Sequence, residues 1–158
     1  MNSDDKFNEK LEMGIDAENI AYEYLVRHNS YVEDLRQQKH GEFAGPALRG
    51  TEGKVILPDF LIYNKNPEKG TYALDVKSKN SIYSINGVKC FTVDDKYLQY
   101  KKAVEIKRMD YLAMMFFFEG RMYLYKDTDC AGTHQYNPNG YGNGLVYYFP
   151  FDKSKMVY

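Results

Sequence analysis

The stretch VILPDFLIY at residues 55–63 is followed, after a short turn, by TYALDVKSK at residues 71–79. The first predicts a strand over residues 54–63 with apolar side chains on both faces, as in a sheet covered on both sides. In the second stretch side chains alternate, so Ala73, Asp75, Lys77 and Lys79 share one face. The turn at residues 64–70 makes the strands antiparallel neighbours, which predicts that Asp59 and Asp75 lie close together.

Asp59 is the only charged residue in its nine-residue stretch. A carboxylate in such surroundings carries a desolvation cost unless it is paired or binds a metal. Pro58 cannot donate a ladder hydrogen bond, so a bulge or sheet edge is expected there. Two neighbouring carboxylates repel each other, and hard oxygen ligands suit Mg²⁺ or Mn²⁺. A structural interpretation stays open for residues 71–79, namely a solvated face with a cross-strand salt bridge.

The rest of the chain alternates helical and extended patterns. Residues 3–28 predict a helix broken or bent near Gly14, with Ala17, Ile20, Ala21, Tyr24 and Leu25 on one apolar stripe. Further expected elements are a weak strand at 30–38, a loop at 41–53, an irregular segment or hairpin around Asn86-Gly87, a helix at 94–108, strands at 111–118, 121–126 and 145–151, and a loop at 128–144.

Helix, three strands, helix and further strands predict an α/β fold bordering on α+β, with a central mixed sheet flanked by helices. The length of 158 residues fits one domain. Glu18 lies at the border of the first apolar stripe, and Lys96 and Gln99 form a polar pair bordering the packed face of the second helix.

Composition and charge are those of an ordinary globular protein. Apolar residues make up 44% and charged residues 27%, and the net charge of −1 lacks the basic excess typical of nucleic-acid-binding proteins. Cys90 and Cys130 form no zinc pattern. The longest apolar run, residues 112–118, is too short to cross a bilayer. With no leader-like pattern at Met1, we expect a soluble protein in a reducing cytoplasm, with no membrane partner.

Four motifs carry a family resemblance: Gly14-Ile15-Asp16-Ala17-Glu18, Pro58-Asp59-Phe60, Asp75-Val76-Lys77 and Lys96-x-x-Gln99-Tyr100. In this order, and on these kinds of element, they resemble the PD-(D/E)XK nuclease superfamily, most closely its Holliday-junction-resolvase-like branch. The third motif carries Asp75 where many members have Glu. The resemblance implies a restriction-endonuclease-like core of order αβββαβ at about residues 14–118, with a C-terminal extension at 119–158. It also implies Mg²⁺- or Mn²⁺-dependent hydrolysis of DNA.

The resemblance also implies roles for individual residues. Asp59, Asp75, the Val76 carbonyl and Glu18 are the implied metal ligands, Lys77 orients or deprotonates the attacking water, and Gln99 holds the site together or contacts the scissile backbone. Lys96, Lys79, Lys101 and Lys102 are expected to contact phosphates.

The sequence alone leaves several points open. It does not fix the form of DNA that is cut, and a homodimer remains open because many such nucleases pair. One alternative is a catalytically silent binding module for nucleic acid or protein on the same fold. Another is a Tyr-rich protein-binding domain that uses residues 128–151.

Overall fold

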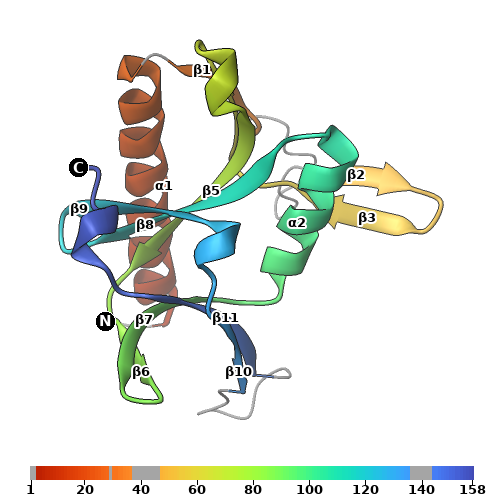
Figure 1. The fold of residues 1–158 in the computed structure, drawn as a ribbon. Helices are drawn as coiled ribbons and strands as arrows, with labels where there is room; N and C mark the ends of the chain where they lie inside the picture. The colour runs from red at the N-terminus through yellow and green to blue at the C-terminus, as the bar shows by residue number, and fades with distance from the viewer. Residues whose placement is uncertain (1–2, 29, 37–46, 136–143) are drawn as a thin grey trace.

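The computed structural model describes residues 3–28, 30–36, 47–135 and 144–158. Within these residues the chain forms a mixed α and β structure (Figure 1). Its elements are α1 (Ser3–Arg27), β1 (Ser30–Asp34), β2 (Ala47–Gly50), β3 (Gly53–Ile56), β4 (Phe60–Asn64), β5 (Thr71–Lys79), β6 (Tyr83–Ile85), β7 (Val88–Val93), α2 (Lys96–Lys107), β8 (Tyr111–Phe118), β9 (Arg121–Lys126), β10 (Gly132–Gln135) and β11 (Leu145–Pro150). Parts of three predicted segments, at 37–38, 41–46 and 136–143, lie outside the described residues.

A five-stranded sheet forms the centre of the molecule, in the order β1-β4-β5-β8-β9. Only β5 and β8 are parallel, and the other neighbours are antiparallel. Parallel neighbours need a crossover connection, and here the chain between β5 and β8 contains β6, β7 and α2. Along the chain this sheet and its helices follow the order α1, β1, β4, β5, α2, β8, β9, with β2 and β3 inserted after β1 and β6 and β7 inserted after β5. The expected mixed sheet is therefore found.

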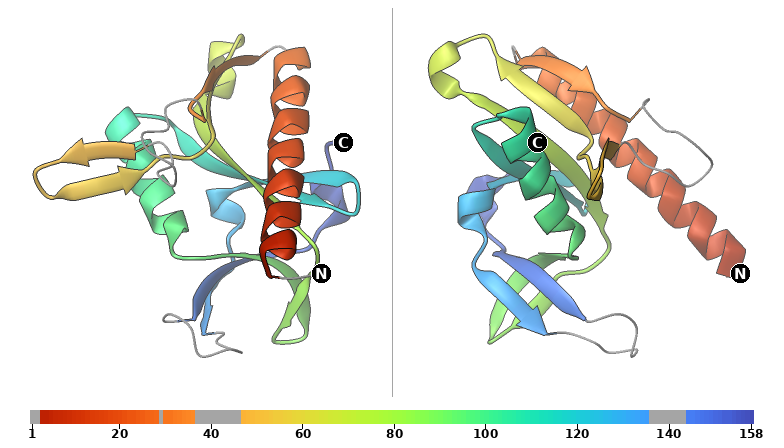
Figure 2. Two further views of the ribbon diagram at one scale, coloured as in Figure 1. Left: turned by 180° about the vertical axis from the view of Figure 1, so that it is seen from behind. Right: turned by 90° about the vertical axis from the view of Figure 1, so that its right-hand side faces the viewer.

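Helix α1 covers one face of this sheet (Figure 2). Its buried Ala17, Ala21 and Leu25 pack with sheet residues such as Phe60 and Leu74, as the predicted stripe requires. The expected break near Gly14 is wrong, because α1 is continuous over Ser3–Arg27. Glycine within a helix costs only about 1 kcal/mol relative to alanine, and the residues on both sides of Gly14 continue the helix across it.

The opposite face is covered by α2 and by a second, four-stranded sheet of order β10-β11-β7-β6. Aromatic rings fill the space between, among them Phe91, Phe116 and Phe149. The hairpin expected around Asn86-Gly87 joins β6 to β7, with φ of 52° and 80° at its two turn residues, as a two-residue turn requires. The loop expected over 128–144 is wrong in part, because it contains β10, which pairs with β11.

The single strand expected over residues 54–63 is also wrong. Strand β3 ends at Ile56 and β4 begins at Phe60, and Pro58 lies in the irregular segment between them. Without an N–H group, Pro58 cannot continue a ladder on both sides of a strand. As a result β3 does not join the central sheet and pairs with β2 in a separate hairpin over residues 47–56. Strand β2 lies within the segment 41–53, which was expected to be a loop.

The outer edge of β9 is covered by the C-terminal segment. The Met122 amide donates to the Tyr158 carbonyl at 3.1 Å, and the Val157 amide donates to the Met122 carbonyl at 2.8 Å. Tyr123 and Met156 form an isolated antiparallel bridge at the same place. No helix among the described residues is long and apolar enough to cross a membrane.

Candidate functional site

The segment between β3 and β4 positions Asp59 beside β5. The last pair of the β4–β5 ladder is Phe60 with Leu74, so Asp59 and Asp75 are the next residues beyond that pair. Past this point the Val76 amide has no β4 carbonyl opposite, and it donates instead to Asp59 Oδ2 at 2.9 Å. The Asp59 carbonyl accepts from the Leu35 amide at 3.0 Å. The carboxylate is therefore held at the point where the two strands separate.

Asp75 is the one buried charged residue among those described, with an exposed fraction of 3%. Lys77 Nζ lies 2.9 Å from Asp75 Oδ2 and 3.3 Å from the Tyr100 hydroxyl, to which it donates. The Asp75 contact is an ion pair without hydrogen-bond geometry, so Asp75 Oδ2 has no hydrogen-bond donor within the described part of the chain. The interpretation of residues 71–79 as a solvated face is therefore wrong at Asp75.

Burial, the Asp75 carboxylate and Glu18 raise the pKa of Asp59 well above its ordinary value, and the Val76 amide and Lys77 offset only part of this rise. Burial by itself lowers the pKa of Lys77, but Asp75, Tyr100 and Asp59 raise it above its usual range. The site therefore has an excess of negative charge that favours any additional positive charge.

Glu18 approaches Asp59 from α1, as its border position predicted, and it forms an ion pair with Arg36, a residue that the sequence did not single out. Glu18 Oε2 lies 3.6 Å from Arg36 Nη1, and Arg36 Nη2 lies 2.8 Å from Asp34 Oδ2. The hydrogen bond with Asp34, together with the charges of Asp34, Glu18 and Asp59, raises the pKa of Arg36 despite its burial. The available signal was the spacing of Asp34 and Arg36 in the strand expected over 30–38, although β1 ends at Asp34 and Arg36 lies in the turn that follows. The register of β1 on β4 is not readable from sequence.

Gln99 acts on the site through the backbone. Its Oε1 accepts a hydrogen bond from the Ile56 amide at 3.0 Å, so α2 holds the chain three residues before Asp59. Tyr100, the next residue, contacts Lys77 directly and was missed as a site residue because it lies on the packed face of the helix. Lys96 is exposed at the first turn of α2, where its amide donates to Asp94 Oδ1.

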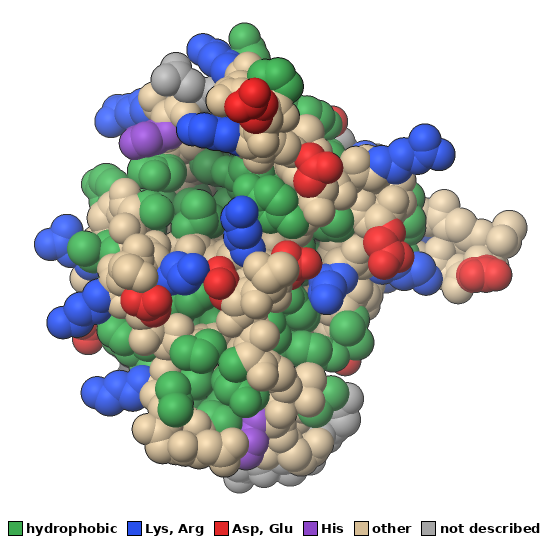
Figure 3. All heavy atoms as spheres, viewed as in Figure 1, with side chains coloured by type: hydrophobic (Ala, Val, Ile, Leu, Met, Phe, Trp, Pro, Cys, Tyr) green, Lys and Arg blue, Asp and Glu red, His purple; other side chains and the backbone are tan. Residues whose placement is uncertain are grey.

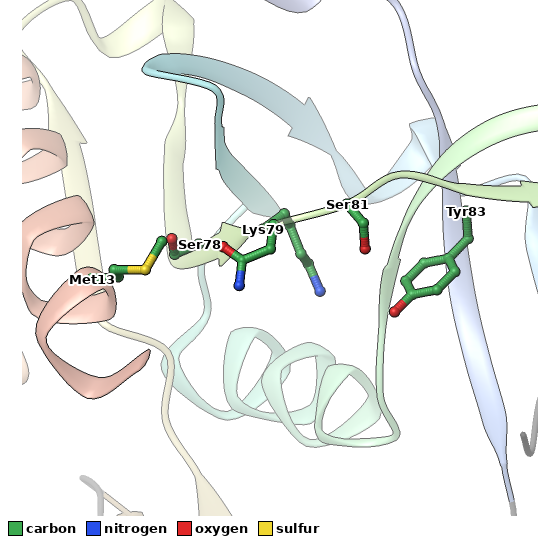
Figure 4. Close-up of a pocket in the computed structure, with 6 residues that line it drawn as sticks. Met13, Ser78, Lys79, Ser81 and Tyr83 are labelled. Atoms are coloured by element: carbon green, nitrogen blue, oxygen red, sulfur yellow. The ribbon is translucent and has the colours of Figure 1, made fainter. Parts of the chain in front are cut away.

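The other predicted basic residues lie around the site rather than in it. Lys79 lines a cavity of about 320 Å³ with Met13, Ser78, Asn80, Ser81 and Tyr83 at the end of β5 (Figure 4). Burial and the neighbouring Lys77 lower the pKa of Lys79 to about 8. Lys101 and Lys102 are exposed on α2, and Lys101 Nζ lies 5.8 Å from the centre of the Tyr97 ring. Figure 3 shows basic and acidic side chains interspersed on one face of the molecule.

Asp59, Asp75 and the Val76 carbonyl are the oxygen donors that a divalent cation could use. No group of three or more His, Cys, Asp or Glu side chains with metal-binding geometry occurs within the described ranges. Mg²⁺ commonly takes only one or two carboxylates and fills its other positions with waters and substrate phosphates. The burial of Asp75, whose Oδ2 has the Lys77 ammonium beside it, and the raised pKa of Asp59 both fit such a cation.

Comparison with protein-family models gives no match for this chain. Comparison with curated protein sequences gives no match either.

Proposed function

We propose that this chain is a metal-dependent deoxyribonuclease with a restriction-endonuclease-like core of the PD-(D/E)XK type. The observation that carries the proposal is the convergence of Asp59, Asp75 and Lys77 where β4 and β5 separate. The order α1, β1, β4, β5, α2, β8 supports the same assignment, because the four sequence motifs lie on or beside elements that form this one sheet or contact it.

In this proposal Asp59 and Asp75, with the Val76 carbonyl, hold one Mg²⁺ or Mn²⁺ ion, and Glu18 contributes charge from α1. When bound, such an ion lowers the pKa of a water molecule and polarises a phosphoryl oxygen. The Val76 amide fixes the Asp59 carboxylate, and Gln99 fixes the segment that carries Asp59. These contacts preorganise the site so that little rearrangement is needed at the moment of reaction.

Lys77 is the group that we propose stabilises the negative charge that develops on the phosphate. During hydrolysis a water oxygen would bond to phosphorus and lose a proton to solvent, while the bond to one bridging oxygen breaks and that oxygen takes a proton from solvent. Because the surrounding carboxylates raise the pKa of Lys77, its side chain is an ammonium that stabilises the negative charge of the transition state. The Tyr100 hydroxyl orients this ammonium between substrate and Asp75.

The proposal is tested by nicking of supercoiled plasmid DNA with Mg²⁺ or Mn²⁺ and with chelator. We expect Lys77→Ala to slow nicking by about 10²–10³-fold, the usual effect of removing one group that stabilises transition-state charge. Lys89→Ala, which removes an exposed lysine of β7, is the matched control and keeps full activity. Unchanged nicking by Lys77→Ala refutes the mechanism. DNA binding without nicking under any metal indicates instead a silent binding module on the same fold.

A further inference from the structure

The β2–β3 hairpin projects from the body of the molecule beside α2 (Figures 1 and 2). Its two strands pair only with each other among the described strands and belong to neither larger sheet. An isolated two-stranded hairpin is marginally stable in water. Its base is held by the Gln99 contact with Ile56 and by packing of Leu48, Val55 and Ile56 against the core.

The hairpin carries a like-charged pair that does not help it to fold. Arg49 and Lys54 are directly opposite each other in the β2–β3 register, and both are exposed. Like charges placed directly opposite on a sheet are destabilising. Within the described ranges neither residue forms an ion pair. The two cations therefore raise the free energy of the hairpin unless an anion from outside lies between them.

A third cationic side chain, that of Lys102 on α2, lines the same recess as Arg49 and Lys54. The recess is a cavity of about 420 Å³ between α2 and the hairpin. Glu52 is the single carboxylate in its lining, so the recess is positively charged in a protein whose net charge is −1. The net charge of the chain argued against nucleic acid as a partner. Phosphate binding, however, depends on the local charge of the binding surface rather than on the net charge.

The recess adjoins the candidate site through two elements. Strand β3 ends at Ile56, three residues before Asp59, and the Gln99 that holds Ile56 lies three residues before Lys102 on α2. Residues three apart on a helix are neighbours on its surface. Anything bound in the recess therefore lies against the strand that leads to Asp59 and against the helix that holds this strand.

We propose that Arg49, Lys54 and Lys102 bind backbone phosphates of duplex DNA next to the cut, so that the hairpin acts as a clamp on the flanking duplex. This inference rests on the proposed nuclease function and assigns its substrate class. Arginine and lysine side chains bind phosphate well. Duplex DNA is favoured over a single strand because a two-stranded ribbon fits the major groove.

The test is fluorescence anisotropy with a labelled duplex and with one of its single strands, in EDTA, across a series of KCl concentrations. The hairpin variant carries Arg49→Ala, Lys54→Ala and Lys102→Ala. The matched control carries Lys89→Ala, Arg121→Ala and Lys153→Ala, which remove the same charge from exposed positions elsewhere. Thermal melting monitors folding, and the hairpin variant should melt no lower than the wild type, because a repulsive pair has been removed.

We expect the hairpin variant to lose more than tenfold in duplex affinity at 0.1 M KCl. Its slope of log affinity against log salt should flatten by about 2.7, since each phosphate contact contributes about 0.9. A control variant that flattens equally, or a hairpin variant that keeps the wild-type slope, overturns the proposal. Equal losses for duplex and single strand overturn the duplex assignment. Displacement of duplex by polyglutamate at equal charge indicates an acidic protein partner and also overturns it.

This binding assay needs neither metal nor cleavage, so it separates the two proposals. If Lys77→Ala abolishes nicking while the hairpin variant binds like the wild type, the site stands and the clamp fails. If the hairpin variant loses binding while Lys77→Ala nicks normally, the proposed mechanism fails and the binding surface stands.

Discussion

At the scale of single residues, burial of the Asp59 carboxylate lowers the stability of the folded protein. Asp59 and Asp75 are neighbouring carboxylates, and Lys77 is the cation that contacts Asp75. In the proposed function, a divalent ion between the carboxylates would compete with the Lys77 ammonium for Asp75 Oδ2. Residues retained for function commonly reduce the stability of a protein, and a cost of this kind at Asp59 can be measured.

Asp59→Asn should stabilise the metal-free protein at neutral pH. The folded-state pKa of Asp59 is raised, so stability is lost as pH rises above the ordinary value of the carboxyl group. Asparagine keeps an acceptor for the Val76 amide but carries no charge. We expect the melting temperature at pH 7 to rise by about 2–4 °C, which corresponds to about 1 kcal/mol for a domain of this size, and the gain to vanish near pH 4.

The same variant tests the metal. Mn²⁺ should raise the melting temperature of the wild type, because a ligand that binds only the folded state stabilises it. It should have no such effect on Asp59→Asn, whereas Asp16→Asn, at an exposed position of α1, should respond like the wild type. A melting temperature that falls at pH 7 in Asp59→Asn would contradict the electrostatic account of Asp59.

Lys79→Met should also stabilise the protein at pH 7. Burial and Lys77 lower the pKa of Lys79 to about 8, so between pH 8 and its ordinary value of 10.5 the unfolded chain binds a proton that the folded protein lacks. Stability contributed at this position therefore rises with pH. We expect a gain of about 1 kcal/mol at pH 7, reduced by solvent screening, that shrinks towards pH 10.

Urea unfolding at pH 7, 8.5 and 10 measures the Lys79 effect, with Lys89→Met as the exposed control. An equal effect of both substitutions on the free energy of unfolding at all three pH values would show that the charged Lys79 side chain does not destabilise the folded protein.

At the scale of elements, the break between β3 and β4 determines the geometry of the site. The apolar run at residues 55–63 contributes strands to two different sheets, because Pro58 separates the part that pairs with β2 from the part that pairs with β5. Gln99 connects the break to α2 through the Ile56 amide. The position of Asp59 thus depends on an element that lies more than 30 residues later in the chain.

Gln99→Ala should lower stability by about 1–2 kcal/mol, because it leaves the partly buried Ile56 amide without its acceptor. Gln99→Glu retains an acceptor oxygen and should recover most of this loss in urea unfolding. Because Gln99 positions Asp59 in our proposal, nicking at 20 °C should fall in the Ala variant even where it is fully folded. Unchanged stability together with unchanged nicking would rule out the positioning role.

The sequence predicted the elements whose patterns are local. Residues 71–79, 111–118 and 121–126 have the predicted bounds, because alternation or continuous apolar character marks each of them. The split at Pro58 was not predicted in full, since a proline indicates an edge or bulge but not which partner each half finds. The second sheet was missed as a sheet because β7 and β11 are separated by more than 50 residues.

Within the candidate site the same distinction holds. The approach of Asp59 to Asp75 and Lys77 follows from a short turn and strand alternation, and the sequence indicated it. Arg36 and Tyr100 were missed because their contacts depend on the register of β1 and on the rotation of α2 about its axis. Neither property is encoded in a short window of residues.

At the scale of the whole molecule, the central sheet separates two apolar clusters, one under α1 and one under α2 and the second sheet. The second cluster is rich in rings, and Phe91 is fully buried at its centre. Its ring lies 4.6 Å from that of Phe116 and 6.0 Å from that of Tyr125. The second sheet is therefore an integral part of the core.

Phe91→Ala should cost about 3–5 kcal/mol, the usual range for removing a buried ring. Guanidinium unfolding followed by far-UV circular dichroism measures the loss, and Val88→Ala on the same strand, at an exposed position, is the control. A loss below about 1 kcal/mol would mean that the second sheet packs only loosely on the first.

The chain's last residues have a consequence for self-association. Because Val157 and Tyr158 bond to Met122, they occupy the flank of β9 where another strand would otherwise add. Within the described part of the central sheet, β1 is then the edge strand without a second neighbouring strand. If two molecules were to pair through β1, they would meet edge to edge through the same strand of each, and that contact would close as a two-fold dimer rather than continue as a filament.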